Sequence, residues 1–323
     1  MNEQRPILLS VEDLAVEFRT RDGIVKALES VSFEVHKGET VGIVGESGSG
    51  KSVTSLAVMG ILPSTAIASG RAMFGGFDLL AATEAERREY RGRELAMIFQ
   101  NPRTALNPIR PVGAQIRDVL ARHANMERDK IAERAIELLA QVQIPEPARR
   151  IHAYPFELSG GTCQRVMIAI AIACSPALLI ADEPTTGLDV TTQAEILDLI
   201  KGLATEHQMA TLLITHDLAS AAEFCDRIVV MHAGHVVESA PTAELFAQPR
   251  HPYTARLIAS MPRPGVILAD LVPIPGSVPD LRRELPPCRY RSRCEQAVGA
   301  CDEAPLPRTL VAPNHNVACR VPL

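Results

Sequence analysis

The chain has 323 residues, which is room for one large domain with an appendage or for two domains. Hydrophobic residues make up 46% of it, enough to bury a sizeable core. The formal net charge of -5 and a pI near 6.0 exclude a strongly basic protein, so no nucleic-acid partner is expected.

The start of the chain does not have the pattern of a secretory signal. Residues 1–6 are polar, and no apolar stretch follows them. The longest apolar run, residues 166–181, is interrupted by Ser175 and Pro176 and is too short on either side to cross a bilayer. We therefore expect a protein that is soluble by itself, whose seven cysteines are thiols or metal ligands rather than disulfides.

The N-terminal part alternates between apolar and polar residues. Leu14, Val16 and Phe18 predict one half-buried strand, and residues 31–35 repeat the pattern. A further strand pair is expected around the two glycines at 75–76. These strands predict an antiparallel layer. Phe18 can stack on an adenine ring, although the alternation alone favours a core aromatic.

Residues 45–52 match the phosphate-binding pattern G-x-x-x-x-G-K-[ST] at every fixed position. A short β-branched run at 40–44 precedes them and predicts a buried parallel strand, and an unbroken helical pattern follows. A glycine-rich turn with a chance lysine does not account for this strand–loop–helix context. The residues expected to bind a nucleotide are Gly45, Ser47, Gly48, Ser49, Gly50, Lys51, Ser52 and Val53.

The residue types in this loop suit a triphosphate. Glycines let backbone N–H groups curl around phosphate oxygens, and the helix that follows points its positive end at them. Lys51 adds a mobile positive charge for the β- and γ-phosphates. The Ser52 hydroxyl is a hard oxygen ligand suited to Mg²⁺, so ATP and Mg²⁺ are the expected ligands.

Another predicted strand ends near Gln100, whose side-chain carbonyl can reach a metal ion or an attacking water. Residues 103–155 then change in character, because apolar residues recur at helical spacing and prolines cluster at both margins. This pattern predicts a helical insert. The apolar stripe consists of Ile131, Ala135, Leu138, Leu139 and Val142.

The segment Leu158-Ser159-Gly160-Gly161-Thr162 opens another predicted helix. Ser159 is a good N-cap, and the bare N–H groups at a helix start attract an anion. Taken alone, the segment is equally consistent with a capped helix that has no ligand.

Two carboxylates end the buried strand predicted at 177–184. Asp182 is placed to hold Mg²⁺ with Ser52. Glu183 is expected to point elsewhere because strand side chains alternate, and to take a proton from a water. Another buried strand, at 211–215, ends in His216, which can contact a γ-phosphate or hold the attacking water. A hairpin is expected at 228–237.

These motifs resemble the ATPase subunit of an ATP-binding cassette (ABC) transporter. In order they are GESGSGKS at 45–52, Gln100, LSGGT at 158–162, LLIADEP at 178–184, Leu188-Asp189 and His216. Longer strings resemble the dipeptide/oligopeptide importer subfamily: AMIFQNP at 96–102, QRVMIAIAIA at 164–173, LITHDL at 213–218 and HPYT at 251–254. The likeness covers nearly the whole chain.

The resemblance implies a head-to-tail dimer in which ATP lies between two subunits. Ser159, Gly160 and Gly161 would then contact the γ-phosphate bound by the partner. Phe18 would stack on adenine, Glu183 would be the general base with His216 and Gln100 beside it, and Mg²⁺ would be held by Ser52, Gln100 and Asp182. Thr162 and Gly187 depart from the commoner residues of the family, but neither departure removes a phosphate contact.

The resemblance also implies partners and a location. The expected partners are a sibling ABC ATPase, which would form a heterodimer with this chain, two transmembrane permeases and an extracytoplasmic peptide-binding protein. The chain would then lie peripherally on the cytoplasmic face of the cell membrane. An importer ATPase for another solute, such as a nickel chelate or glutathione, and a soluble ABC ATPase outside transport remain alternatives.

The sequence predicts an α/β fold: a RecA-like P-loop NTPase core with an antiparallel β-subdomain and a helical insert, plus a cysteine-rich extension. The expected ATPase domain is 1–260, with a helical subdomain at about 103–160, and the extension is 261–323.

The extension is rich in proline, arginine and cysteine and has little apolar periodicity, so a bound metal that cross-links it would help it to fold. Four thiolates suit zinc or an iron–sulfur cluster, and the absence of a C-x-x-C pair weakens a zinc ribbon. Free or disulfide-bonded cysteines also remain open, and His315 is a possible substitute ligand. The family resemblance implies a [4Fe–4S] cluster. The four ligands would be Cys288, Cys294, Cys301 and Cys319.

Overall fold

The computed structural model describes residues 5–21, 23–262 and 273–323, which fold into two compact units. The first is built mainly from Ala82–Leu212, with the short segment His36–Glu39. The second comprises the described residues of Ile7–Val35, Thr40–Ala81 and Leu213–Leu323. Residues 273–323 therefore share a unit with the P-loop. The predicted division near residue 260 stays a prediction, and residues 263–272 of the predicted extension lie outside the described residues.

The first unit contains the strand that ends in Asp182, the first of the two predicted carboxylates. Strand β6 (Leu95–Ile98) pairs in parallel with β7 (Leu178–Asp182), and every residue of both strands is buried. Strand β8 (Ala210–Thr215) lies next to β7, begins in this unit and ends in the second. Continuous apolar strands of this kind form when a parallel sheet is covered on both faces. Helices α7 (Gly160–Ile172) and α8 (Val190–Glu206) belong to the same unit.

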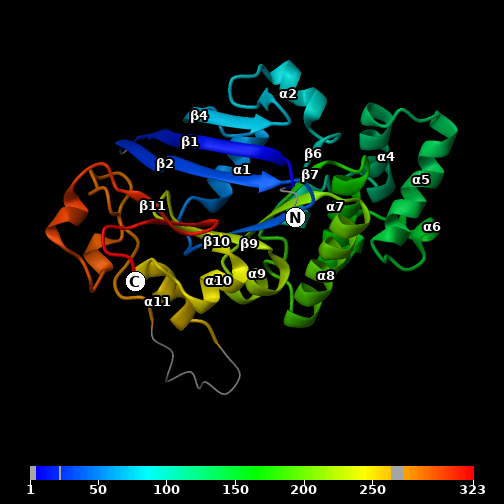
Figure 1. Ribbon diagram of the computed structural model, residues 1–323. Helices are drawn as coiled ribbons and strands as arrows, with labels where there is room; N and C mark the ends of the chain where they lie inside the picture. The colour runs from blue at the N-terminus through cyan, green and yellow to red at the C-terminus, as the bar shows by residue number, and fades with distance from the viewer. Residues whose placement is uncertain (1–4, 22, 263–272) are drawn as a thin grey trace. The chain divides into compact units, whose positions relative to one another are not determined.

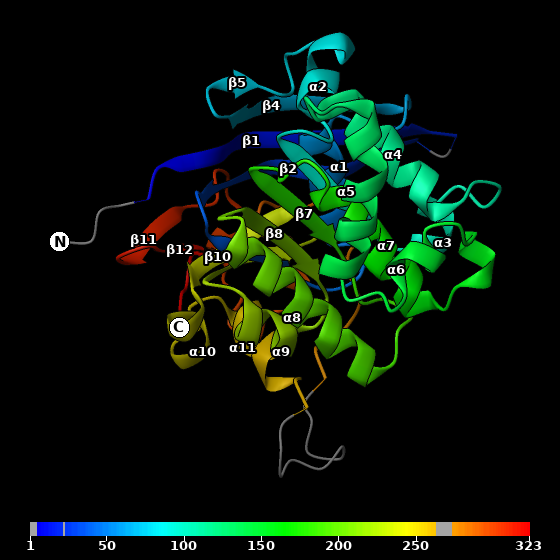
Figure 2. The same cartoon turned by 90° about the vertical axis from the view of Figure 1, so that its right-hand side faces the viewer.

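The predicted helical insert is present in the first unit. It consists of α3 (Pro102–Ala105), α4 (Val112–His123), α5 (Arg128–Gln141) and α6 (Pro147–Arg150), followed by a 3-10 turn at Pro155–Glu157. Figure 2 shows α4 and α5 beside α7, which both of them contact. The apolar stripe of α5 is buried, as its spacing predicted. A short helix, α2 (Glu84–Tyr90), precedes β6, begins with a capping box at Thr83 and buries no residue.

The predicted antiparallel layer forms one sheet of the second unit. Its order is β2 (Gly23–His36), β1 (Ile7–Thr20), β4 (Ala66–Phe74) and β5 (Phe77–Asp78). Strand β1 runs antiparallel to β4, from Leu9 opposite Phe74 to Phe18 opposite Ala66 (Figure 1). Phe74 and Phe77 face each other across the two-glycine turn, which confirms the expected strand pair.

The second sheet of this unit carries the P-loop. Strand β3 (Thr40–Val44) pairs in parallel with β9 (Arg227–His232), which forms the predicted hairpin with β10 (His235–Pro241). Helix α1 (Lys51–Met59) follows β3. The later helices are α9 (Leu218–Phe224), α10 (Thr242–Ala247), α11 (Pro252–Ala259) and two 3-10 turns at Arg291–Arg293 and Gly299–Asp302.

The hairpin β9–β10 does not end the sheet, because two strands from the C-terminal part extend it. Strand β12 (His315–Ala318) pairs with β10, and β11 (Arg308–Ala312) pairs with β12. These two strands of the C-terminal part were not predicted from the sequence. Its strands join the sheet that carries the P-loop and share the core of that unit.

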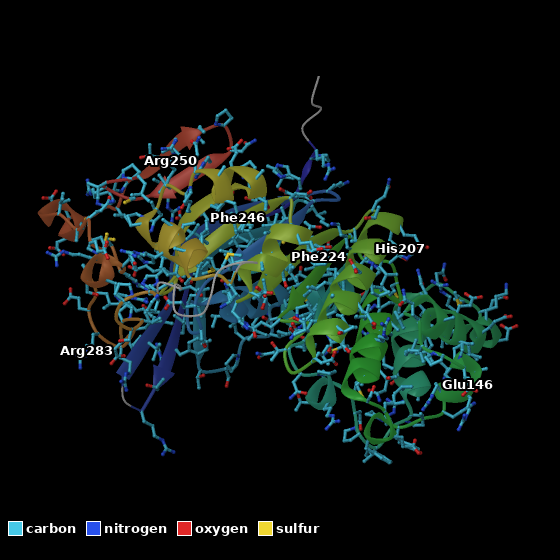
Figure 3. The ribbon with its side chains drawn as sticks, turned by 90° about the horizontal axis from the view of Figure 1, so that it is seen from below. Glu146, His207, Phe224, Phe246, Arg250 and Arg283 are labelled. Atoms are coloured by element: carbon cyan, nitrogen blue, oxygen red, sulfur yellow. The ribbon has the colours of Figure 1, made fainter. Side chains whose placement is uncertain are left out.

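A buried carboxylate fastens β12 to β10. Glu238 accepts hydrogen bonds from the backbone N–H groups of Arg250 and His251, at 2.7 and 2.9 Å, and lies 2.7 Å from His315 Nε2. Arg250, labelled in Figure 3, reaches the end of the chain with a bond of 2.8 Å to the carbonyl of Leu323. Burying a carboxylate is unfavourable unless its oxygens are bonded, so this set of donors stabilises the attachment.

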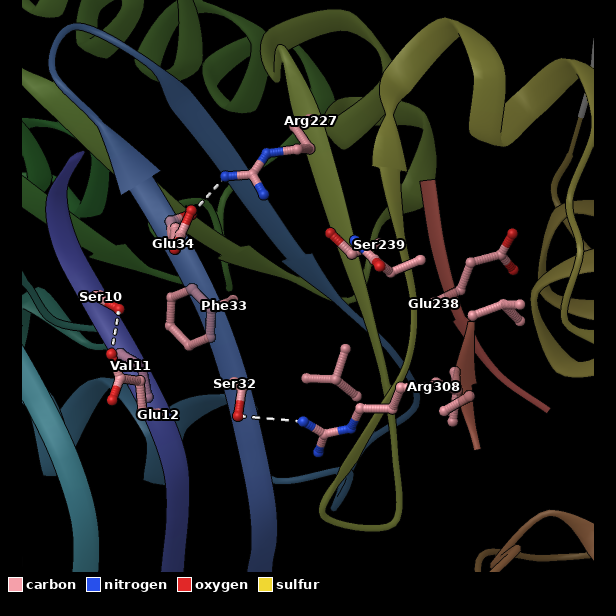
Figure 4. Close-up of a pocket in the computed structure, with 15 residues that line it drawn as sticks. Ser10, Val11, Glu12, Ser32, Phe33, Glu34, Arg227, Glu238, Ser239 and Arg308 are labelled. Atoms are coloured by element: carbon pink, nitrogen blue, oxygen red, sulfur yellow. Dashed lines mark hydrogen bonds between the residues drawn. The ribbon is translucent and has the colours of Figure 1, made fainter. Parts of the chain in front are cut away.

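A pocket of about 370 Å³ lies where β11 and β12 approach the N-terminal sheet (Figure 4). Arg308 crosses it to donate to Ser32 Oγ at 3.2 Å and to the Ser30 carbonyl. Arg227 donates to the Glu34 carbonyl on the same strand. Both guanidinium groups are thus engaged by β2, and the pocket reflects how the C-terminal strands attach to that sheet.

Among the residues the structure describes, no helix has both the length and the apolar character needed to span a bilayer.

Candidate nucleotide site

The phosphate-binding pattern forms the turn between β3 and α1. Gly45 has a φ of 154°, and a Cβ there would lie 2.1 Å from the carbonyl oxygen of Met231, so only glycine fits. Gly48 has a φ of 78°, and a Cβ there would meet nothing within 4 Å. The loop is therefore tightly packed where it leaves the strand and open at its tip. An open, left-handed tip is the shape that backbone N–H groups need to surround an anion.

Lys51 is held over this loop. Its side chain is buried, with the residue 5% exposed, and Nζ donates to the carbonyl oxygens of Gly45 at 2.8 Å and Glu46 at 3.0 Å. Helix α1 begins there with no side-chain cap bond and no acidic residue in its first turn, which leaves its positive end uncompensated by a carboxylate. Ser52 and Val53, in that first turn, are half-buried. This part of the unit is electrostatically suited to an anion.

Phe18 and His216 also belong to the second unit, by virtue of their positions in the chain. Phe18 lies near the end of β1 and is half-buried, so part of its surface remains open to a ligand. His216 directly follows β8 and is exposed. The next helix, α9, is capped by Asp217, whose carboxylate accepts from the Ala219 N–H at 3.0 Å.

The carboxyl ends of β6 and β7 bring three predicted residues together in the first unit. Asp182 is the last residue of β7 and is 5% exposed. Gln100 lies just past β6, and its Nε2 donates to Glu183 Oε2 at 2.9 Å. Thr186 Oγ1 donates to the same oxygen at 3.0 Å. A glutamine and a threonine thus fix the carboxylate of Glu183.

Glu183 does not continue strand β7, so the alternation of strand side chains does not apply to it. Strand β7 ends at Asp182, and Glu183 has a φ of 45°, in the left-handed region that residues other than glycine rarely adopt. A turn, rather than strand alternation, therefore sends the second carboxylate in its own direction. Backbone strain at one residue is typical of functional positions.

Ser159 is the N-cap of α7, as predicted. Its Oγ accepts from the Thr162 N–H at 3.2 Å and lies 2.8 Å from Thr162 Oγ1. Ser159 is exposed, and Gly160 and Gly161 are half-buried. The start of this helix is accessible, and the hydroxyl of Thr162 is bonded within it.

The sequence motifs assigned no contact to three residues near the P-loop. The Glu46 N–H donates to Tyr253 Oη at 3.0 Å, and the Glu46 carboxylate accepts two bonds from Arg293, at 2.7 and 2.9 Å. Tyr253 lies in the HPYT string, which marked the family without indicating a contact. Arg293 is 247 residues away from Glu46, and no local pattern predicts a contact over that separation.

An aromatic cluster lies beside these contacts. The ring centroids of His232 lie 4.6 Å from Tyr253 and 5.3 Å from Tyr290, and His251 is 5.9 Å from Tyr290. Burial, followed by the positive charge of Arg293, lowers the pKa of His232 to about 4. Burial, followed by the nearby His232, lowers the pKa of His251 to about 3. Both imidazoles are therefore neutral near pH 7.

The four C-terminal cysteines all belong to the second unit. Cys288, Cys301 and Cys319 are buried and Cys294 is half-buried, and the Cys288 N–H donates to the Cys301 carbonyl at 3.3 Å. Burial raises the pKa of the Cys288 thiol to about 11, with further contributions from the other three cysteines. Within the described part of the chain, no three His, Cys, Asp or Glu side chains converge as the ligands of one metal ion. His315, considered as a substitute ligand, has its Nε2 against Glu238.

Comparison with known proteins places the chain in a family. Residues 28–186 match the family described as ABC transporter, and residues 237–301 match the oligopeptide/dipeptide transporter C-terminal region. The probable peptide ABC transporter ATP-binding protein y4tR of Sinorhizobium fredii is 46% identical over 98% of this chain and 96% of its own length. This chain belongs to the ABC transporter family. The dipeptide transport ATP-binding protein DppD of Bacillus subtilis, another member, is 44% identical over 97% of this chain and 94% of its own.

Solved structures of ABC family members share the fold. A dimeric structure of the ATP-binding cassette MJ0796 bound to ADP and Pi has a TM-score of 0.65 and 27% identity, and the match covers 73% of this chain and 99% of that one. CbiO1 of Clostridium perfringens has a TM-score of 0.63 and 29% identity, over 75% of this chain and 92% of that one. An ABC ATPase cassette fold is therefore established for this chain.

The two buried histidines should make the fold acid-sensitive. The pKa of His232 is lowered from 6.5 to about 4, so the unfolded chain binds a proton between these pH values that the folded chain does not. The contribution of His232 to the free energy of unfolding is then fully present above pH 6.5. The free energy of unfolding falls as the pH drops, by on the order of 3 kcal/mol at pH 4. We expect His232→Phe to flatten the pH dependence of the free energy of unfolding in this window. The exposed His152→Phe is the control. Equal slopes for His232→Phe and wild type would contradict this assignment.

Proposed function

We propose that this chain is the ATP-hydrolysing subunit of an ABC importer that takes up dipeptides or oligopeptides. The observation that carries the proposal is the glycine loop that bends around an open tip, with Lys51 buried and aimed at its carbonyls. The choice of cargo is supported by identities of 46% and 44%, over nearly the full chain, to peptide and dipeptide transport ATP-binding proteins.

The P-loop would bind the phosphates of ATP. Lys51 would exchange its two carbonyl acceptors for the β- and γ-phosphates, while N–H groups at the loop tip and the start of α1 surround the same oxygens. Phe18, still partly exposed, would stack on the adenine ring. Binding therefore needs little rearrangement of the loop, because Gly45 already holds it against β9.

Hydrolysis would depend on the end of β7 in the first unit. Glu183, fixed by Gln100 and Thr186, would accept the proton of the attacking water, and His216 would orient that water or the γ-phosphate. Ser52, Asp182 and Gln100 supply hard oxygen ligands that suit Mg²⁺, which when bound would neutralise charge on the β- and γ-phosphates. Catalysis of this kind consists mainly of positioning and charge stabilisation.

A second ATPase subunit would complete the site. Ser159, Gly160 and Gly161, at the accessible start of α7, would bind the γ-phosphate held by that partner. A solved relative of this fold is itself dimeric with ADP and Pi bound, which supports the arrangement. We take the partner to be a sibling ATPase, so that the complex is a heterodimer.

The remaining partners follow from the transporter family. Two transmembrane permeases and an extracytoplasmic peptide-binding protein would complete the importer, with this chain held peripherally on the cytoplasmic face. The cargo would be chosen by the permeases and the binding protein. An importer of a nickel chelate or glutathione would therefore differ from a peptide importer in those subunits and not in this chain.

We infer that the four cysteines of the C-terminal part would hold an iron–sulfur cluster, with a single zinc ion as the alternative. Four thiols, three of them buried, are the donor number of a [4Fe–4S] cluster, and, besides burial, the charge of Cys301 contributes to the raised pKa of each of Cys288, Cys294 and Cys319. A bound cluster would supply cross-links between the short turns that carry these residues.

Replacing the proposed base should separate ATP binding from hydrolysis. In Glu183→Gln, we expect ATP affinity to persist and hydrolysis by the assembled transporter to fall at least about a hundredfold, because the amide cannot accept the proton. The same substitution at the exposed Glu206 is the control. Steady turnover in Glu183→Gln would rule out this carboxylate as the base.

The transporter assignment predicts a membrane complex. The tagged chain, extracted in detergent from membranes of its own cells, should co-purify with two permeases and a second ATPase. Its ATP hydrolysis should rise when the binding protein is loaded with peptide. Recovery without any membrane protein would count against import, and stimulation only by a nickel chelate or glutathione would reassign the cargo.

The cluster predicts iron in the purified protein. Chain purified without oxygen should contain iron and sulfide and absorb visible light, and Cys301→Ser should lose both properties. Cys174→Ser, a thiol of the ATPase core, should retain them. Iron-free, colourless protein after anaerobic purification would exclude the cluster, and stoichiometric zinc would favour the single ion.

A further inference from the structure

The C-terminal part of the chain reaches into the P-loop through one ion pair. Arg293, whose side chain is 2% exposed, donates Nη1 to Glu46 Oε2 at 2.7 Å and Nη2 to Glu46 Oε1 at 2.9 Å. Glu46 is the second residue of the phosphate-binding pattern, at a position that the pattern leaves open. Both residues belong to the second unit, so this contact lies within one compact body.

Glu46 is held at its backbone as well. Its N–H donates to Tyr253 Oη at 3.0 Å, and its carbonyl accepts from Lys51 Nζ at 3.0 Å. One residue thus connects α11, the 3-10 turn of Arg293 and the lysine that would bind phosphate. A shift of Glu46 would displace an acceptor of Lys51 directly.

A carboxylate in this loop has an electrostatic cost for the proposed ligand. A triphosphate carries several negative charges, and a like charge at a neighbouring residue repels it, all the more where the site is partly buried. Burial raises the pKa of Glu46, but the hydrogen bonds and charge of Arg293 outweigh this and hold the pKa below its usual value. The carboxylate therefore stays charged and needs its partner when a polyanion arrives.

Arg293 is pre-organised for this role. Its Nε donates to the Pro275 carbonyl at 2.7 Å, and its guanidinium lies 5.6 Å from the centre of the Tyr290 ring. A bidentate guanidinium–carboxylate pair fixes orientation as well as charge, which a lysine does not do. The desolvated arginine has little freedom to leave Glu46, so neutralisation does not depend on a mobile surface side chain.

A second arginine in the same segment contacts the residue next to one that bonds the P-loop. Arg289 donates to the Ala233 carbonyl and pairs with Glu29. The next residue along, Gly234, donates its N–H to the Ser49 carbonyl of the P-loop at 2.9 Å. The two arginines therefore approach the phosphate-binding turn from one short segment, residues 289–293.

We propose that Arg293 is a positioning residue of the nucleotide site, which neutralises Glu46 so that the P-loop can accept a nucleoside triphosphate. The C-terminal extension then sets ATP affinity in the same subunit, without contacting the nucleotide. This inference rests on the proposed function in one respect, namely that the P-loop binds ATP.

The test is a double-mutant cycle on Arg293 and Glu46, in which titration calorimetry measures the affinity of the full chain for ATP. Arg293→Gln leaves Glu46 as an unpaired carboxylate and should weaken ATP binding about tenfold. The loss should shrink at high salt, because screening reduces like-charge repulsion. Adding Glu46→Gln should restore affinity to within about threefold of wild type, since the repelling charge is then gone. In the assembled transporter, Arg293→Gln should raise KM for ATP and leave kcat unchanged.

Arg291→Gln is the matched control, because Arg291 lies in the same turn but pairs with Asp302 at an exposed position. It should bind ATP as the wild type does. A folded Arg293→Gln chain with wild-type affinity would overturn the inference, as would a double variant that binds as weakly as Arg293→Gln. If Arg293→Gln does not fold, Glu46→Gln decides alone: binding at least as tight as wild type supports the inference, and a tenfold loss overturns it. Failure of the wild-type chain to bind ATP, with Lys51→Ala indistinguishable from it, would instead refute the proposed function.

Discussion

A loop that binds a polyanion has to present N–H groups and positive charge at close range while keeping negative charge away. In this chain that constraint acts on the turn between β3 and α1. The loop begins at Gly45, which packs against a carbonyl of β9, and it ends at the start of α1, where no side chain caps the helix. Lys51 completes the turn by bonding two of its carbonyls from within. Much of the second unit surrounds or supports this turn.

The first unit meets a different chemical need. Its parallel strands end together, and that shared edge brings Gln100 into hydrogen-bonding contact with Glu183 although 83 residues separate them. Asp182 is buried at the end of β7, whereas Glu183 lies outside the strand and its carboxylate accepts from Gln100 and Thr186. Two acids in sequence thereby acquire different surroundings, which is what the proposed roles in metal binding and proton transfer require.

Local patterns predicted most of this and failed where contacts are long-range. The P-loop, the acidic strand and the Ser159 cap each follow from a few adjacent residues whose spacing has one structural meaning. Strands β11 and β12 escaped prediction because they have five and four residues and their pairing is decided by β10. Glu46 escaped because the motif leaves its position unspecified, and its partners are supplied by a distant part of the chain.

Glu46 is one of the points at which the C-terminal part is attached to the P-loop unit. A residue that repels the proposed ligand is tolerated in the loop only while a buried arginine opposes it, so loop and extension constrain each other. The relation is reciprocal, because linked equilibria shift each other by equal free energies. Whatever the docked extension adds to the affinity for a triphosphate, the bound triphosphate adds to the attachment of the extension. Glu238 and Arg250 would then support the nucleotide site indirectly. They fasten β12 and Leu323 to the rest of the unit, and Arg293 belongs to the same C-terminal part of the chain.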